Sequence, residues 1–213
     1  MSVSEHGETV RRTPPATGGL ESVSRRQSPR KGTRMALADS LEGSDLVLML
    51  LAAPTNVDSA KGRVNGITRL EKLLYLVEKE TSVAESVAGE HLQFKAYNYG
   101  PFSKDVYEAV ELLEESGLLA EERVVDGQTI DSMEDVNVTG AVEADEYVER
   151  RFVLTEHGRL VATLLANHHP AVAEQLTGIK DRYAARSLSG LIRYVYKTYP
   201  DSAKNSVIAH RYA

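Results

Sequence analysis

The sequence predicts a mainly helical domain with a small β-hairpin wing, of winged-helix type, behind a disordered N-terminal tail. Three observations support this prediction: a change in composition near residue 40, apolar periodicity of 3.6 in the later segments, and two strand-like segments around an acidic insert. We expect the tail to cover residues 1–40 and one domain to cover residues 41–213, a length that can bury a hydrophobic core.

The tail and the body differ in charge. Residues 1–34 are rich in Arg, Ser, Pro, Gly and Thr, the composition of a disordered segment. Residues 1–40 have a net charge of +3, whereas residues 41–213 have −9, within a total of −6. Because non-specific binding to phosphates needs a cationic surface, this acidic body argues against a coat-like nucleic-acid-binding protein.

Composition also excludes several classes of protein. The chain has no cysteine, which rules out a disulfide framework, a thiolate metal site and a cysteine nucleophile. Its longest apolar run, Leu46–Ala53, is far shorter than the roughly 20 residues that span a bilayer. We therefore expect a cytoplasmic protein that has no membrane contact.

Two helices are expected at the start of the domain. Residues 45–53 predict a short buried helix with Ser44 as its N-cap. Thr68 and Glu71 have the spacing of a capping box and predict the start of a second helix, which runs to about Glu80. The apolar residues of this second helix lie at i, i+3, i+4 and i+7 and are Leu70, Leu73, Leu74 and Val77.

A strand and a third helix follow. Residues 92–96 alternate between apolar and polar and predict a short half-buried strand. Gly100-Pro101 is a turn signal, Ser103 is placed to cap the next helix, and Gly117 is expected to end that helix.

The acidic insert covers residues 121–149 and contains ten Asp and Glu against Arg123. We expect it to be a solvated, partly disordered loop between strands at residues 118–119 and 150–154. A hairpin after two helices is the element order of a winged helix. Further helices are expected over residues 155–167, 170–177 and 187–198.

Three blocks of sequence resemble a known family. They are residues 66–76 (GITRLEKLLYL), residues 94–107 (FKAYNYGPFSKDVY) with SGLL at 116–119, and residues 194–206 (YVYKTYPDSAKNS). Together they resemble the YwgA-like family of small bacterial and archaeal proteins and, more distantly, the Panacea domain of SocA-type antitoxins. The resemblance implies a winged-helix-like domain without an established catalytic centre. For Panacea-like members it implies neutralisation or delivery of a toxin through protein contact.

The leading functional hypothesis is a non-catalytic protein-interaction module, antitoxin-like or adaptor-like, whose partner is a protein such as a toxin or a defence protein. Five of the ten tyrosines lie in the last 31 residues, and Tyr and Arg are favoured at interface hot spots. The 97–101 block is interpreted either as a binding edge or as a turn that sets the angle of the following helix, and single C-terminal tyrosines either as interface or as core residues. The expected contact residues are Tyr97, Tyr99, Gly100, Pro101, Phe102, Arg193, Tyr196 and Tyr199.

The alternative hypothesis is a DNA-binding transcriptional regulator. The helix over residues 103–116 has a net charge of −4, so the usual reading surface of a winged helix is closed to DNA. Binding would have to use basic residues elsewhere, together with the tail. Ordinary solvated helix faces are the preferred interpretation of these residues. The candidate nucleic-acid contacts are Lys61, Arg63, Arg69, Lys72, Lys197 and Lys204.

No catalytic, metal or cofactor-binding residues are expected. The chain has no P-loop, dinucleotide fingerprint, nucleophile elbow or kinase signature. His168 and His169 precede Pro170 and fit a polar helix end better than a zinc site, which needs three or four ligands.

Overall fold

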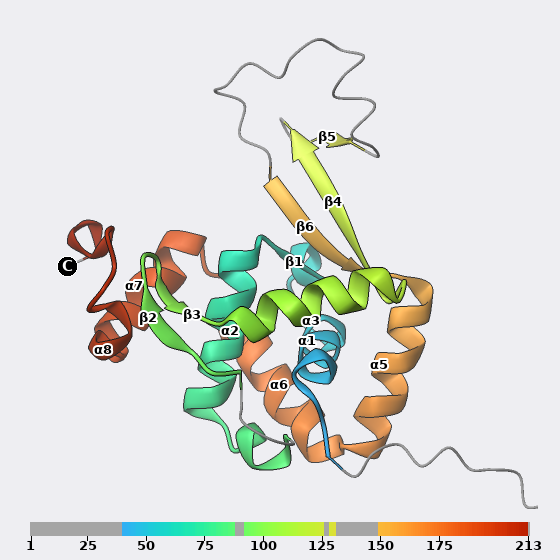
Figure 1. Ribbon diagram of the computed structural model, residues 1–213. Coiled ribbons are helices and arrows are strands. Elements are labelled where there is room, and N and C mark those ends of the chain that lie inside the picture. Colours follow the sequence, from blue (N-terminus) through green and yellow to red (C-terminus); the bar gives the residue numbers. More distant parts are fainter. Residues whose placement is uncertain (1–39, 88–91, 126–127, 131–148, 213) are drawn as a thin grey trace, which may run out of the picture. The chain divides into compact units, whose positions relative to one another are not determined.

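Helices make up most of the structure, and two small antiparallel sheets accompany them (Figure 1). The structure is a computed structural model that describes residues 40–87, 92–125, 128–130 and 149–212. The predicted tail up to residue 39 lies outside the described residues, as do residues 126–127 and 131–148 of the predicted insert. The mainly helical class with a small sheet is confirmed.

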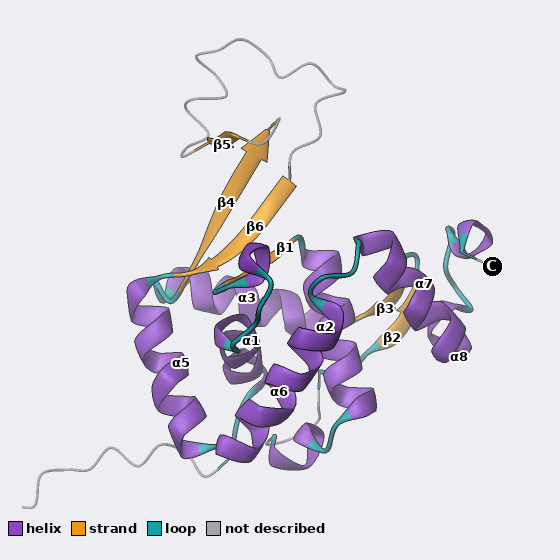
Figure 2. Ribbon diagram, turned by 180° about the vertical axis from the view of Figure 1, so that it is seen from behind, coloured by secondary structure: helices purple, strands orange, loops and turns teal. Residues whose placement is uncertain are grey.

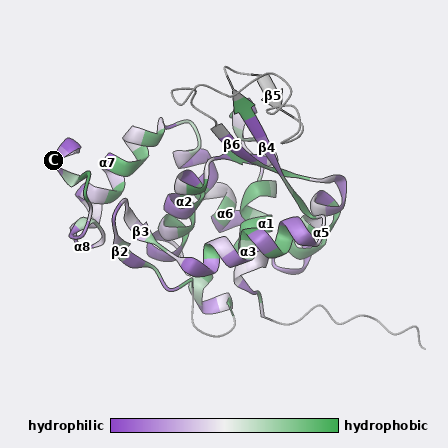
Figure 3. Cartoon of the chain, turned by 45° about the horizontal axis from the view of Figure 1, so that its top comes forward, coloured by the Kyte–Doolittle hydropathy of each residue, from purple (hydrophilic) through white to green (hydrophobic). Residues whose placement is uncertain are grey.

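Helix α1 (Gly43–Ala52) is the most deeply buried element. Its residues from Leu46 to Leu51 are all buried, and Figure 3 shows the hydrophobic colour along this helix. The helix begins before the predicted Ser44 cap, because the Glu42 N–H donates to Asp45 Oδ2 at 2.9 Å and leaves Ser44 inside the first turn. Within the described segments, no helix combines the length and the apolar character needed to cross a membrane.

Helix α2 (Ile67–Glu80) follows strand β1 (Arg63–Asn65) directly. The predicted apolar stripe is buried. The predicted capping box is wrong: Gly66 is the N-cap, with φ of 81°, and no side chain caps this helix. The Gly66 N–H donates to the Arg150 carbonyl at 2.7 Å. The helix therefore begins without a capping hydrogen bond from the Thr68 hydroxyl.

Strands β2 (Lys95–Tyr97) and β3 (Gly100–Phe102) form a hairpin. The predicted Gly100-Pro101 turn is wrong, because these residues belong to β3 and the turn lies at Asn98 and Tyr99. Proline is tolerated here because both strands of a two-stranded sheet are edge strands.

Helix α3 (Lys104–Glu115) has the predicted ends. The Ser103 Oγ accepts a hydrogen bond from the Val106 N–H at 3.3 Å, and Gly117 has φ of 69° after the last turn.

The second sheet has the strand order β1-β6-β4-β5. Strands β4 (Leu119–Val125) and β6 (Glu149–Leu154) pair antiparallel from Leu119 opposite Leu154 to Val124 opposite Glu149, and β5 (Gln128–Ile130) extends this sheet. Figures 1 and 2 show β4 and β6 extending away from the helices.

The prediction of a loop from residue 121 is therefore wrong for the residues that form β4 and β5. Glu121 accepts a hydrogen bond from Arg150 Nε across the strands at 2.9 Å, and this ion pair lets an acidic residue join the sheet.

The C-terminal part consists of helices α5 (Glu156–His168), α6 (Pro170–Tyr183), α7 (Leu188–Thr198) and the short α8 (Pro200–Ala203). α6 extends beyond the predicted end at residue 177, because further apolar side chains on its inner face are buried. Those side chains are Ile179 and Tyr183. α1 packs against α3, α5 and α6, so these helices surround it.

Side-chain hydroxyls cap two of these helices at the residues where the sequence predicts the helices to begin. Thr155 Oγ1 accepts from the Gly158 N–H at 3.0 Å at the start of α5, and Ser187 Oγ accepts from the Gly190 N–H at 3.1 Å at the start of α7.

Two glycine-to-alanine substitutions test how closely α5 approaches the residue that precedes β4. A Cβ on Gly158 would lie 2.0 Å from the Leu118 carbonyl oxygen, whereas one on Gly178 in α6 would meet nothing within 4 Å. We expect Gly158→Ala to lower the free energy of unfolding by about 1–3 kcal/mol. Gly178→Ala should raise it by about 0.5–1 kcal/mol, because alanine favours helix. Urea denaturation measures both changes, and equal effects would contradict the close approach.

Candidate functional site

The β2–β3 hairpin brings together two sequence blocks that are far apart in the chain. Asn205 Nδ2 donates to the Ala96 carbonyl at 3.0 Å, and the Val207 N–H donates to the Asn98 carbonyl at 2.9 Å. Gly100, with φ of 92°, lies so close to Tyr196 that a Cβ there would be 2.6 Å from the ring. The C-terminal segment therefore packs directly on the hairpin.

A buried ion pair on α2 fixes the other end of β3. Lys72 Nζ donates to the Pro101 carbonyl at 2.8 Å, and Glu71 Oε1 accepts from the Ser103 N–H at 3.2 Å. Lys72 Nζ lies 3.8 Å from Glu71 Oε2, with both side chains buried. Burial raises the pKa of Glu71 and lowers the pKa of Lys72 to about 8, while each charge partly offsets the shift of the other.

Three aromatic rings lie in a row on the outside of this anchored hairpin. Ring centroids are 5.2 Å apart for Tyr97 and Phe102 and 5.4 Å apart for Phe102 and Tyr107. The register places Lys95 opposite Phe102, so Tyr97 and Phe102 are diagonal neighbours on one face of the hairpin. We call Tyr97, Phe102 and Tyr107 the aromatic face.

The aromatic face is open to solvent. Tyr97 is 53% exposed and Tyr107 is 41% exposed, and Tyr99 at the turn is 58% exposed. Tyr107 is not among the contact residues expected from the sequence. The sequence signal for including Tyr107 in the contact surface was its position in the first turns of α3, five residues after Phe102.

The predicted contact residues divide into an exposed group and a buried group. Tyr97, Tyr99 and Arg193 are exposed, and Phe102 is half-buried. Gly100, Pro101 and Tyr196 are buried, and Tyr199 is half-buried. The two interpretations of the 97–101 block thus apply to different residues: its tyrosines point outward, and its Gly-Pro pair positions the chain.

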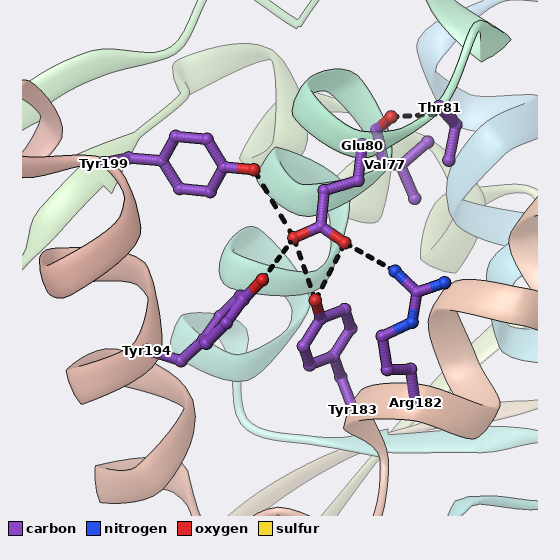
Figure 4. A network of polar contacts seen from close by, with 7 residues as sticks. All are labelled: Val77, Glu80, Thr81, Arg182, Tyr183, Tyr194 and Tyr199. Atoms are coloured by element: carbon purple, nitrogen blue, oxygen red, sulfur yellow. Dashed lines mark hydrogen bonds and ion pairs between the residues drawn. The ribbon is translucent and has the colours of Figure 1, made fainter.

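The C-terminal tyrosines meet at one carboxylate, that of Glu80 at the end of α2 (Figure 4). Both carboxylate oxygens accept hydrogen bonds from the Tyr183 hydroxyl at 2.8 Å, and one oxygen also accepts from Tyr194 at 2.9 Å and from Tyr199 at 3.4 Å. Arg182 forms an ion pair with the other oxygen at 2.9 Å. These hydroxyls bind an internal partner, so the cluster joins α6 and α7 to α2.

Burial changes the acidity of this cluster. Burial, with hydrogen bonds to Tyr194 and Glu80, holds the pKa of Tyr183 above its usual value. Burial raises the pKa of Tyr199 to about 12, and the nearby Glu80 charge adds to this shift. These tyrosines therefore remain neutral donors at physiological pH.

The six basic residues proposed as nucleic-acid contacts do not share one environment. Lys72 is buried in the ion pair described above, and Lys61 pairs with Asp58 on the surface. Arg63 and Arg69 line a small pocket together with Lys180, which sequence reasoning missed. Of the remaining two, Lys197 lies exposed near the end of α7, and Lys204 lines a larger cavity.

The larger cavity has a volume of about 440 Å³ and lies between α2, β2 and α8. Tyr75 and Phe94 line it, with their rings in an edge-to-face contact at 5.3 Å. Three lysines and one carboxylate also line it, so the charged side chains of this opening beside the hairpin are mostly basic; they are Lys79, Lys95, Lys204 and Asp201.

Comparison with known proteins assigns no family to the chain. No protein-family model matches it, and no curated protein matches it. The resemblance to YwgA-like and Panacea-domain proteins therefore stays a prediction that rests on the three sequence blocks.

The two buried lysines predict an unusual pH dependence of stability. Burial lowers the pKa of Lys72 and of Lys180 to about 8, whereas an unfolded lysine has a pKa near about 10.4. Between these values the unfolded chain binds more protons, so stability rises with pH. We expect the free energy of unfolding to rise by roughly 1–3 kcal/mol for each lysine between pH 8 and about pH 10.

Above about pH 10 the sign reverses, because unfolded tyrosines ionise before the buried ones. Urea denaturation at several pH values measures the curve. Lys180→Met should remove part of the rise. A wild-type stability that stays flat or falls between pH 8 and 10 would contradict the burial of these ammonium groups.

Proposed function

We propose that the protein is a non-catalytic protein-interaction module of the cytoplasm, antitoxin-like or adaptor-like, that binds its partner through the aromatic face and Tyr99. One observation supports this most strongly: the exposed rings of Tyr97 on the hairpin and Tyr107 on α3 both contact the half-buried ring of Phe102, and buried groups hold the hairpin in place. Exposed aromatic clusters on soluble proteins mark interaction sites, since a tyrosine ring buries a large area and keeps a polar tip.

Charge around the aromatic face favours a protein partner over a nucleic acid. Tyr107 belongs to α3, whose exposed residues include Glu108 and Glu111, with Asp105 partly exposed. Proteins that stack bases on aromatic rings surround those rings with a positive groove. The α3 side of the aromatic face is acidic, whereas the exposed Lys95 lies opposite Phe102 on the hairpin side. The acidic side suits a partner with basic residues beside an apolar centre.

The rigid support of the hairpin favours binding as well. Lys72 and Glu71 hold β3 from α2, while Tyr196 packs on Gly100. A surface that is already ordered loses less conformational entropy when a partner binds. The buried part of the predicted contact set thus contributes indirectly, by presenting the exposed rings.

A DNA-binding regulator is the second candidate, and the sheet topology favours it. We propose a winged-helix arrangement for α1, β1, α2, α3, β4 and β6, because β1 pairs with β6 and β6 pairs with β4. In such proteins the helix before the wing enters the major groove. Here that helix is α3, in which Lys104 is outnumbered by carboxylates, so the helix has a negative net charge. This function therefore ranks below protein binding.

Substitution of exposed tyrosines tests the proposal. Tyr97→Ala combined with Tyr99→Ala should lower the recovery of a specific protein partner by roughly tenfold or more, as expected for hot-spot aromatics. Arg193→Ala tests whether the contact surface extends to α7, where Arg193 is exposed; lower recovery is expected if it does. Affinity purification with quantitative mass spectrometry, followed by titration of the purified partner, measures the effect.

A matched control uses exposed leucines of α5. Leu160 and Leu164 are 58% and 57% exposed, so Leu160→Ala with Leu164→Ala removes a similar apolar surface elsewhere. Recovery should be unchanged in this control, and circular dichroism should be unchanged in all variants. Binding to duplex DNA that weakens steeply with salt, without any protein partner, would favour the regulator instead.

A further inference from the structure

We propose that the larger cavity, between α2, β2 and α8, is a binding site for a nucleoside monophosphate. The cavity has a volume of about 440 Å³, and clefts of roughly 300–1,000 Å³ are usual for small-molecule ligands. Its lining combines aromatic rings with an excess of positive charge, so it suits a ligand that has both a planar ring and an anionic group. The proposed site does not depend on the aromatic face or on a protein partner.

The positive charges of this cavity come from three separate segments. Lys79 belongs to α2, Lys95 belongs to β2, and Lys204 directly follows α8. Lys95 and Lys204 are exposed to solvent and form no ion pair with any described residue. The side chain of Lys79 is 40% exposed, and its Nζ pairs with Glu78 at 2.8 Å. Like charges that line one opening repel one another, and a bound anion relieves that repulsion.

The net charge of the lining matches that of a phosphate monoester. Three lysines against the single carboxylate of Asp201 give the lining a net charge of +2, and a phosphate monoester carries about −1.5 to −2 at pH 7. A lysine ammonium group binds phosphate as a point charge. Asp201 repels a bare phosphate, but its carboxylate accepts hydrogen bonds from hydroxyl groups, which a ribose supplies. Both signs of charge in the lining therefore have a counterpart in a nucleotide.

Phe94 supplies the surface for a planar ring. Its side chain is half-buried in the wall of the cavity, and Tyr75 supports it through an edge-to-face contact with ring centroids 5.3 Å apart. Tyr75 in turn meets the Tyr199 ring edge to face at 5.5 Å. Nucleic-acid bases stack on aromatic side chains with little regard to sequence, because every base has a π face. The aromatic wall therefore suits a nucleobase without selecting one.

The outer edge of β2 favours a small ligand over an extended peptide. A peptide that adds to a sheet needs free hydrogen-bonding groups on a strand edge. Here the Ala96 carbonyl already accepts from Asn205 Nδ2 at 3.0 Å, and the Asn98 carbonyl accepts from the Val207 N–H at 2.9 Å. The C-terminal segment thus occupies these acceptors beside the cavity. The same bonds join two walls of the cavity, so the site is formed before a ligand binds.

Isothermal titration of the full chain with adenosine monophosphate, at constant ionic strength, tests the proposal. We expect saturable binding and a melting temperature that rises with the concentration of the nucleotide. Adenosine lacks the charge and ribose 5-phosphate lacks the ring, so each should bind at least roughly tenfold more weakly than the complete nucleotide.

Two sets of substitutions locate the binding in this cavity. Lys95→Gln combined with Lys204→Gln should weaken binding of adenosine monophosphate by roughly tenfold or more, and Phe94→Leu should weaken it by a similar factor. The matched control is Lys104→Gln, which removes an exposed charge on α3 that does not line the cavity and should leave binding unchanged. The lysine double variant keeps the test decisive if Phe94→Leu fails to fold, because both lysines are exposed.

The proposal is overturned if the wild type does not bind adenosine monophosphate, or if the lysine double variant binds it as tightly as the wild type. It is also overturned if adenosine or ribose 5-phosphate binds as tightly as the complete nucleotide. Equal binding of a short glutamate peptide would make the cavity a site for acidic peptides instead. Equal binding of an oligothymidylate that lacks terminal phosphates would make it a site for single-stranded nucleic acid, and either result contradicts the proposal.

Discussion

The buried ammonium group of Lys72 supports the surface on which the proposed function depends. It lies beside Glu71 on α2 and donates to the Pro101 carbonyl, while Glu71 accepts from the Ser103 N–H. A two-stranded hairpin is marginally stable alone. These bonds attach β3 and the start of α3 to one rigid helix, so the rings of the aromatic face keep a fixed arrangement.

The other end of α2 organises the C-terminal half in the same way. The Glu80 carboxylate accepts hydrogen bonds from three tyrosine hydroxyls and one guanidinium. These groups belong to α6, α7 and the residue that precedes α8. α8 in turn packs against the hairpin. Polar groups in the first half of α2 and at its last residue thus connect it to the hairpin and to the C-terminal segment, while its apolar stripe packs into the core.

Sequence reasoning succeeded where the determining contact is local. The cap at Ser103 binds an N–H three residues away, so the residue pattern alone reveals it. Thr155 and Ser187 cap their helices through contacts of the same short range. The capping box at Glu71 failed because its carboxylate accepts instead from Ser103, 32 residues later in the chain. A long-range contact of this kind leaves no local pattern.

The candidate site shows the same division. The aromatic and Gly-Pro block was recognised from sequence, but the exposure of Tyr97 and the burial of Tyr196 depend on how the C-terminal segment packs on the hairpin. Tyr107 joins Tyr97 through Phe102, and this row of rings exists only once the hairpin and α3 are in place.

The basic residues of α2 show why charge counted along a chain does not define a binding surface. Arg69 lines a small pocket together with Arg63 and Lys180, Lys72 is buried against the hairpin, and Lys79 lines the larger cavity beside β2. A helix places residues three apart on neighbouring positions of its surface, yet packing gives each of these cations a different role. A phosphate backbone needs many exposed cations on one surface. The cations of α2 do not share one surface, so their presence in the sequence does not require a nucleic-acid partner.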